Sequence, residues 1–147
     1  MSVPIHKRLA IVLAALWCGG SAGLAFVAVP MAFAQLGQPQ LAGPLAAQFF
    51  TALAWMCLVC GLGLLGLSRT VWVLRRLAPL ILLAMLAALL QEHAVADRIL
   101  SARASGGDLK LWHGLGSALV LLQCGCAAWV LWRLSGTAAD PDPVAGR

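Results

Sequence analysis

The sequence has few charged side chains, and it has none at all from residue 9 to residue 68. Asp, Glu, Lys and Arg make up only 10% of its 147 residues, whereas 62% of the residues are apolar. A water-soluble domain must show water one face of each helix or strand, so it does not leave about sixty consecutive residues uncharged. The scarcity of charge therefore excludes a soluble globular domain and predicts a single integral membrane domain.

The sequence also lacks the short motifs that mark several enzyme classes. It contains no nucleophile elbow, phosphate-binding loop, HExxH zinc motif or dinucleotide fingerprint. The net charge is +5, but no basic stripe alternates with aromatic residues, so we expect no nucleic-acid partner. The basic residues instead flank apolar runs, as topology signals and anionic-lipid contacts do. Tyrosine is absent, which leaves the six tryptophans to fill the aromatic role at the membrane interfaces.

Four apolar segments are long enough to cross a bilayer. A helix rises about 1.5 Å per residue, so about twenty apolar residues span a hydrocarbon core of about 30 Å. In the third segment the uncharged run is shorter, so we expect that helix to continue past Glu92 and His93. The sequence predicts an all-α membrane protein, a four-transmembrane-helix bundle in a membrane domain of residues 9–134, with spans at about 9–29, 45–67, 72–97 and 111–134.

The segments outside this domain are short. Residues 1–8 are predicted to be a cytoplasmic N-terminus, and residues 135–147 a disordered cytoplasmic tail without an apolar pattern. A cleaved signal peptide is the alternative for the first apolar run, because Ala32-Phe33-Ala34 resembles a cleavage site. That run is, however, longer than the usual signal core of about 7–15 residues.

Basic residues gather at one end of the predicted bundle. Lys7 and Arg8 precede the first span, and Arg133 follows the fourth. Three arginines, Arg69, Arg75 and Arg76, lie between the second span and the uncharged run of the third, whereas the loop after the first span is uncharged. Positively charged loops stay in the cytoplasm, so both termini are predicted to be cytoplasmic and the protein to lie in the cell inner membrane.

Glycine and proline punctuate the first two spans. Gly19 and Gly23 have the spacing that lets two helices approach closely in lipid. Pro30 either kinks the first helix or simply precedes its end. Residues 35–43 are predicted to form the loop to the second span. The residues that we expect to have a structural role are Trp17, Gly20, Pro30 and Gly43.

All five cysteines fall inside predicted spans, at about one depth. Cys57 and Cys60 are three residues apart and share a helix face. Thiolates in such a layer suit a soft ion such as Cu(I). The alternative is packing, because a free cysteine is a small apolar residue, and we expect no disulfide at this depth.

Ionisable residues form a second cluster, at the end of the third span and the start of the fourth. Glu92, His93 and Asp97 lie at the end of the third span, and His113 lies at the start of the fourth. Such groups at membrane depth mark paths for ions, protons or ligands, and this set could hold a divalent ion or meet a haem edge. The alternative is that they are solvated residues at the headgroup level. The metal-site candidates are therefore His113, His93, Glu92, Asp97, Cys57 and Cys60.

Two motifs resemble a known family. Leu16-Trp17-Cys18-Gly19-Gly20-Ser21 and Trp112-His113-Gly114-Leu115-Gly116-Ser117 look like the transmembrane-protein-205-like domain family, a domain of unknown function. The resemblance implies a four-helix inner-membrane protein without an established activity, whose eukaryotic relatives are associated with resistance to platinum drugs. The Trp-x-Gly-Gly element is also similar to the copper-resistance D family and, more remotely, to four-helix haem-pathway oxidases, which place histidines in early helices. Here the only early histidine is His6.

These observations favour a non-enzymatic membrane protein with a structural, accessory or small-solute-handling role. The alternatives are binding or transport of a soft or divalent metal of the copper type, and haem-linked membrane oxidation. We expect no cofactor, with copper or haem as alternatives. The expected partners are the lipid bilayer and either further copies of the chain or other membrane proteins, because four helices make a poor solitary transporter.

Overall fold

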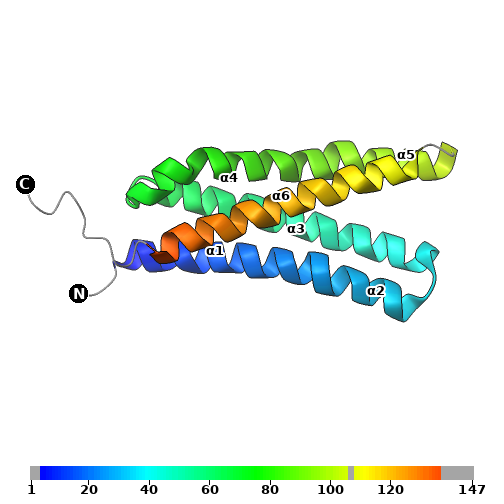
Figure 1. Ribbon diagram of the computed structural model, residues 1–147, viewed down its shortest axis with the longest axis horizontal. Coiled ribbons are helices and arrows are strands. Elements are labelled where there is room, and N and C mark those ends of the chain that lie inside the picture. The colour runs from blue at the N-terminus through cyan, green and yellow to red at the C-terminus, as the bar shows by residue number, and fades with distance from the viewer. Residues whose placement is uncertain (1–3, 106–107, 137–147) are drawn as a thin grey trace, which may run out of the picture.

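The protein is a bundle of long helices, seen here in a computed structural model that describes residues 4–105 and 108–136. All the regular elements in these ranges are helical. Figure 1 shows them running side by side along the long axis. The elements are α1 (Ile5–Gly23), η1 (Leu24–Ala28), α2 (Val29–Leu36), α3 (Pro39–Leu67), α4 (Trp72–Leu90), η2 (Gln91–Val95), α5 (Ala96–Ser105) and α6 (Leu109–Gly136).

Joined end to end, these elements make four helices that are long and apolar enough to cross a membrane, as predicted. The four spans are Ile5–Leu36, Pro39–Leu67, Trp72–Ile99 and Leu109–Gly136. The protein is thus an all-α bundle and a multi-pass membrane protein. The fourth helix ends at Gly136, and the rest of the predicted tail lies outside the described residues.

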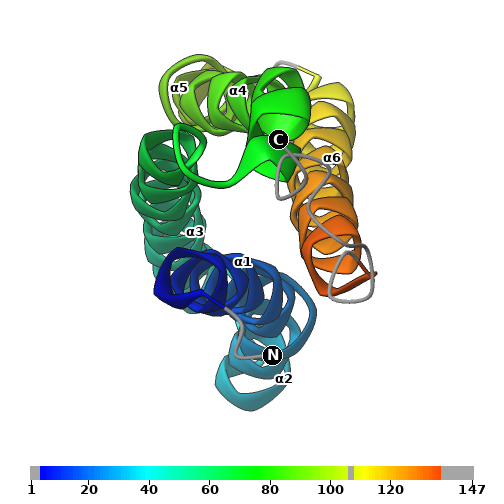
Figure 2. The same cartoon turned by 90° about the vertical axis from the view of Figure 1, so that its left-hand side faces the viewer.

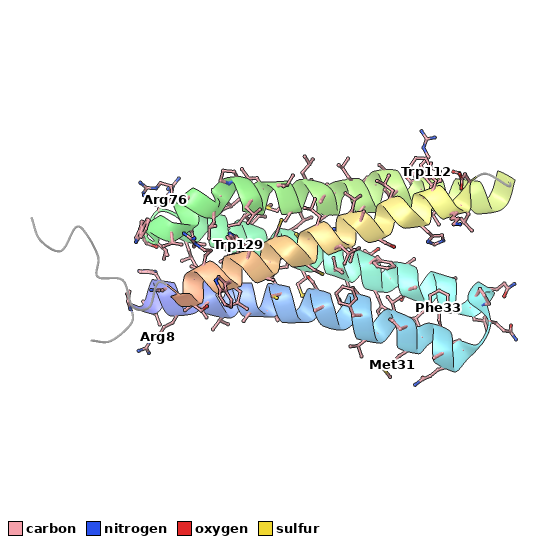
Figure 3. The ribbon with its side chains drawn as sticks, viewed as in Figure 1. Arg8, Met31, Phe33, Arg76, Trp112 and Trp129 are labelled. Atoms are coloured by element: carbon pink, nitrogen blue, oxygen red, sulfur yellow. The ribbon has the colours of Figure 1, made fainter. Side chains whose placement is uncertain are left out.

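The four spans form a ring in which each packs against two neighbours. α1 contacts α3 and α6, and α4 contacts the same two helices from the other side. Figure 2 shows this ring end-on. We call the end where α1 begins and α6 ends the terminal end, and the opposite end, where α2 and α5 end, the distal end. Arg8 and Arg76 lie at the terminal end and Trp112 lies toward the distal end (Figure 3).

The first span is longer than its predicted bounds, and Pro30 lies within it. A proline inside a helix has no N–H to donate, and its ring crowds the carbonyl four residues earlier. The π-helical turn η1 comes directly before Pro30, and the Val29 N–H there reaches back five residues to the Leu24 carbonyl. α2 then packs on α3 and angles away from α6 (Figure 1).

The loop between the first two spans is shorter than the predicted 35–43. Only Gly37 and Gln38 lie outside helices, and Gly37 has a φ of 62° that favours glycine. α3 begins at Pro39, where the missing N–H would have had no helical partner in any case. Gly43 is therefore a buried residue inside α3 and not a loop residue.

Close helix approach occurs at glycines other than the predicted pair. A Cβ added at Gly19 or Gly23 would meet nothing within 4 Å. A Cβ at Gly20 would meet the Met56 side chain of α3, and one at Gly61 would lie 2.8 Å from Met85 Sδ of α4. Gly20 is thus the glycine of α1 at which α3 packs closely, and it was among the residues expected to have a structural role.

The core of the terminal half is apolar. It includes Leu64, Leu74 and Ile81, all with 0–1% of their surface exposed, and the cysteines Cys57, Cys60 and Cys126 pack in the same cluster. Among the residues that the structure describes, the buried polar side chains lie farther along the bundle, toward the distal end.

Candidate functional site

The contact between α1 and α6 is a regular seam. Its residues recur at intervals of four, three and four, which is the spacing of a coiled-coil seam. All are fully buried, with 0% of their surface exposed: Ala10, Ala14, Trp17 and Ser21 on α1, and Gln123, Ala127, Val130 and Leu134 on α6.

The two helices run in opposite directions, so the order of residues along α6 is reversed relative to α1. Cys18 on α1 lies near Cys124 on α6. Ser21 and Gln123, both on the distal side of these cysteines, therefore lie at a similar level of the bundle. The seam has apolar layers at the terminal end and a polar layer at its distal limit.

The polar layer has hydrogen-bonding atoms that no described protein group satisfies. Gln123 donates from Nε2 to the Leu119 carbonyl at 3.3 Å, but its Oε1 has no protein partner. Ser21 Oγ has none either. The other four serines whose side chains are described each donate to a carbonyl one turn back in their own helix. Ser21 is thus held away from the bond that a helical serine usually makes.

Trp17 lies one turn deeper in the seam and is 0% exposed. Its indole N–H lies beside the Cys57 thiol on α3, whose sulfur is a weak hydrogen-bond acceptor. A buried tryptophan N–H usually finds an acceptor, and here the Cys57 sulfur takes that place.

An ionisable side chain enters the bundle from the third span. Glu92 is half-buried, and its Oε1 accepts a hydrogen bond of 2.8 Å from Thr51 Oγ1 on α3. This bond joins two spans through a carboxylate that lies within the span Trp72–Ile99. Ionisable groups at such depth are costly and usually functional.

The π-helical turn η2 turns Gln91 inward beside this carboxylate. Gln91 is 7% exposed, and its Oε1 has no described protein partner. α6 approaches closely at Gly116, where an added Cβ would lie 3.4 Å from Val95 Cγ1 and 3.6 Å from Gln91 Nε2. π-Helical turns are frequent at functional sites because they redirect side chains within a helix.

Buried and half-buried polar side chains thus come from all four spans, from the middle of the bundle toward its distal end. They are Ser21 from the first span, Thr51 from the second, Gln91 and Glu92 from the third, and Gln123 from the fourth. Those around Glu92 supply donors, acceptors and one carboxylate, which are groups that bind small polar molecules.

The predicted cluster of ionisable residues divides in the structure. Glu92 points into the bundle, whereas His93, Asp97 and His113 are exposed. Arg98 lies 5.5 Å above the ring of Trp112, so the third and fourth spans also meet through a cation–π contact at this end. Histidine, cysteine and carboxylate side chains within the described ranges form no group of three or more that could hold a metal ion.

The cysteines do gather at one level. Cys57 has Cys60, Cys124 and Cys126 as neighbours, and Cys124 faces Cys18. All five are free thiols, and Cys57 and Cys60 are buried among apolar side chains. Their surroundings are those of packing residues.

The sequence was compared with known protein families, curated proteins and solved structures. Residues 12–108 match the domain of unknown function DUF4149. The chain belongs to this family. No curated protein and no solved structure matches the chain. The DUF4149 match spans the first three helices, so it covers Trp17, Ser21, Thr51, Gln91 and Glu92 and ends just before α6.

Sequence reasoning did not identify Ser21, Thr51, Gln91 and Gln123 as site residues. A signal was present, because Ser21 and Gln123 continue the four-three-four spacing of alanines and large apolar residues on their helices. A polar residue at such a position faces a neighbouring helix and not lipid.

Proposed function

We propose that this protein binds a small polar solute inside the distal half of its bundle, and that Glu92 is the charged group of the site. The observation that carries the proposal is the hydrogen bond between Thr51 and Glu92, which fixes a carboxylate between two membrane spans. A carboxylate has sites for about four hydrogen bonds, and Thr51 supplies one. The solute that suits the rest is a small cation or another hydrogen-bond donor.

The role is accessory binding and not transport by a single chain. The terminal half of the bundle is packed with apolar residues and cysteines, and ions and polar solutes do not cross such a core. A solute held near Glu92 therefore enters and leaves by the distal half. Transport across the membrane would need further copies of the chain or a partner protein.

The charge distribution supports an inner-membrane location with the terminal end in the cytoplasm. Arg8, Arg76 and Arg133 belong to that end, and Arg76 stacks on Trp72 at 4.8 Å, which fits an interfacial anchor. We also propose, from the motifs around Trp17 and His113, that the chain is related to the transmembrane-protein-205-like family. The copper and haem alternatives have no supporting observation among the described residues.

Thermal unfolding of the purified chain in detergent tests the proposal. The probes are ammonium, methylammonium and sodium chloride at equal ionic strength. A ligand that binds only the folded state stabilises it by about 2.7 kcal/mol at one hundred times its Kd. We expect one of these probes to raise the Tm of the wild type in a saturable way.

The matched variants are Glu92→Gln, which keeps the shape of the side chain, and Asp97→Asn, which removes an exposed carboxylate from the same span. The rise in Tm should disappear in Glu92→Gln and persist in Asp97→Asn. An equal rise in Glu92→Gln, or no saturable rise with any of the three probes, would reject the proposal.

A further inference from the structure

We infer that a groove at the distal end of α6 binds one phospholipid of the phosphatidylethanolamine class, whose headgroup has a phosphate and a primary ammonium. The groove has a volume of about 600 Å³ and is lined by Asp108, Lys110, Leu111, Gly114, Leu115 and Ala118. These residues are spaced at three and four positions along the start of α6, so they share one face of the helix. The inference does not rest on the role proposed for Glu92, which does not line the groove.

The groove begins at the level of the lipid headgroups. The span Leu109–Gly136 has 28 residues, so it is about 42 Å long, which exceeds a hydrocarbon core of about 30 Å. Its first turn therefore extends into the headgroup region, where Asp108 and Lys110 are exposed. Trp112, which follows closely, is a residue typical of that interface. The groove thus has a charged mouth, and its apolar residues lie deeper along the helix.

The two charged side chains match the two charges of this headgroup. Asp108 precedes the helix and Lys110 lies in its first turn, so Asp108 is the outer of the two residues. In phosphatidylethanolamine the phosphate lies next to the glycerol, and the ammonium lies farther out. Lys110 can bind the phosphate while the carboxylate of Asp108 accepts hydrogen bonds from the lipid ammonium. The quaternary ammonium of phosphatidylcholine cannot donate such bonds, and phosphatidylglycerol has no cation.

Asp108 is held at the mouth of the groove by the helix that it caps. Its Oδ1 accepts a hydrogen bond of 3.0 Å from the Leu111 N–H, and its backbone carbonyl accepts one of 3.5 Å from the Trp112 N–H. A carboxylate has sites for about four hydrogen bonds, so the cap leaves most of them for the lipid. The carboxylate is therefore fixed in place and still able to bind an ammonium group.

The floor of the groove has the shape and polarity for an acyl chain. A Cβ added at Gly114 would meet nothing within 4 Å, and the small residue Ala118 lies one turn deeper. Leu111 and Leu115 lie beside this stripe and are 62% and 45% exposed. An acyl chain laid along the stripe gains dispersion contacts with these leucines and continues into the hydrocarbon core.

NMR of the full chain in detergent, with nitrogen-15 in its tryptophans, tests the inference. The probes are phosphatidylethanolamine, phosphatidylcholine and phosphatidylglycerol with identical oleoyl chains. The Trp112 indole signal, assigned by its loss in Trp112→Phe, reports on the groove. We expect phosphatidylethanolamine to shift it saturably and to bind about fivefold more tightly than the other two, as about 1 kcal/mol from an exposed ion pair gives. Equal affinities of the three lipids would overturn the inference.

Two variants separate the headgroup contact from the groove. Asn caps a helix about as well as Asp, so Asp108→Asn should remove the preference for phosphatidylethanolamine and leave the helix intact. Gly114→Leu should fill the groove and weaken the binding of all three lipids. Its matched control is Gly125→Leu, at an exposed glycine of α6 where a Cβ also meets nothing, and binding there should not change. A preference that persists in Asp108→Asn, or binding unaffected by Gly114→Leu, would reject the site.

The source of the headgroup is tested by competition. Glycerophosphoethanolamine has the same charges without acyl chains, and we expect it not to displace the lipid at equal concentration. Equal displacement would show that the site takes a soluble phosphate ester, and the lipid would then be the wrong occupant. If Gly114→Leu does not fold, Lys110→Gln replaces it: this variant should weaken all three lipids, because each has a phosphate. Unchanged binding in Lys110→Gln would contradict the inference.

Discussion

The glycines of this bundle are of two kinds, which differ in whether a Cβ added to them would meet a neighbouring helix. At Gly61 a Cβ would lie 2.8 Å from Met85 Sδ and 3.4 Å from Ile81 Cγ2, so the Met85 side chain would have to move to make room for it. At Gly66, five residues along the same helix, a Cβ would meet nothing within 4 Å. In lipid, helices associate mainly by close packing, so the first kind of glycine contributes to stability and the second does not.

The pair of variants Gly61→Val and Gly66→Val tests this difference. We expect Gly61→Val to lower the free energy of unfolding by about 1–3 kcal/mol, because overpacking forces α3 and α4 apart. Gly66→Val should change it by less than about 0.5 kcal/mol, as substitutions away from packed contacts do. Unfolding in detergent measures both, and equal stability of the two variants would contradict the close approach at Gly61.

At the scale of elements, the first span is shaped by one proline. Pro30 cannot donate to the Phe26 carbonyl, and the helix adjusts by the wider turn Leu24–Ala28. The change of direction takes α2 out of the α1–α6 seam and ends the seam just beyond Ser21.

Pro30→Ala should restore the regular turn, because the new N–H can bond to the Phe26 carbonyl. We expect the backbone amide and carbonyl NMR shifts of Leu24–Ala28 to move toward α-helical values, and amide exchange at residues 28–30 to slow. Pro39→Ala is the control, since Pro39 opens α3, where an N–H has no helical partner. Unchanged shifts in Pro30→Ala would show that packing, and not the proline, makes the wide turn.

For the whole molecule, the two ends differ in charge and the two halves differ in polarity. Among the described residues, the terminal end has arginines and a lysine without a carboxylate, whereas the distal end has Arg98 and Lys110 together with Asp97 and Asp108. The buried polar groups lie farther toward the distal end than the apolar core does. If the basic end is cytoplasmic, as we propose, the polar half faces the other side of the membrane.

Labelling of intact cells with a membrane-impermeant maleimide measures this orientation. Gln38→Cys and Asp108→Cys lie at exposed distal positions and should react from outside, whereas Thr70→Cys at the terminal end should react only after permeabilisation. The native cysteines lie inside the spans and give little background. Reaction of Thr70→Cys in intact cells would reverse the topology.

The fold followed from the sequence more closely than the site did. The number of spans, and the continuation of the third helix past Glu92, were predictable because long uncharged runs have few structural solutions in lipid. The helix ends were less predictable: Gly43 was expected in a loop but lies buried within α3, and Pro44 lies inside the same helix. For the site, the charge of Glu92 within a span was enough to make it a candidate. Its hydrogen-bond partner Thr51 is uncharged, and the sequence did not identify it.

The sequence by itself determined that this chain is a four-span membrane protein with one basic end. The reason is local: each charge or unpaired backbone group in hydrocarbon has a cost that does not depend on the rest of the fold. Only the tertiary structure decided which polar side chains are enclosed. Ser21 and Gln123 are buried, whereas His93 and His113 are exposed. The reason is that the rotation and tilt of each helix are set by its neighbours, through contacts such as those at Gly20 and Gly61.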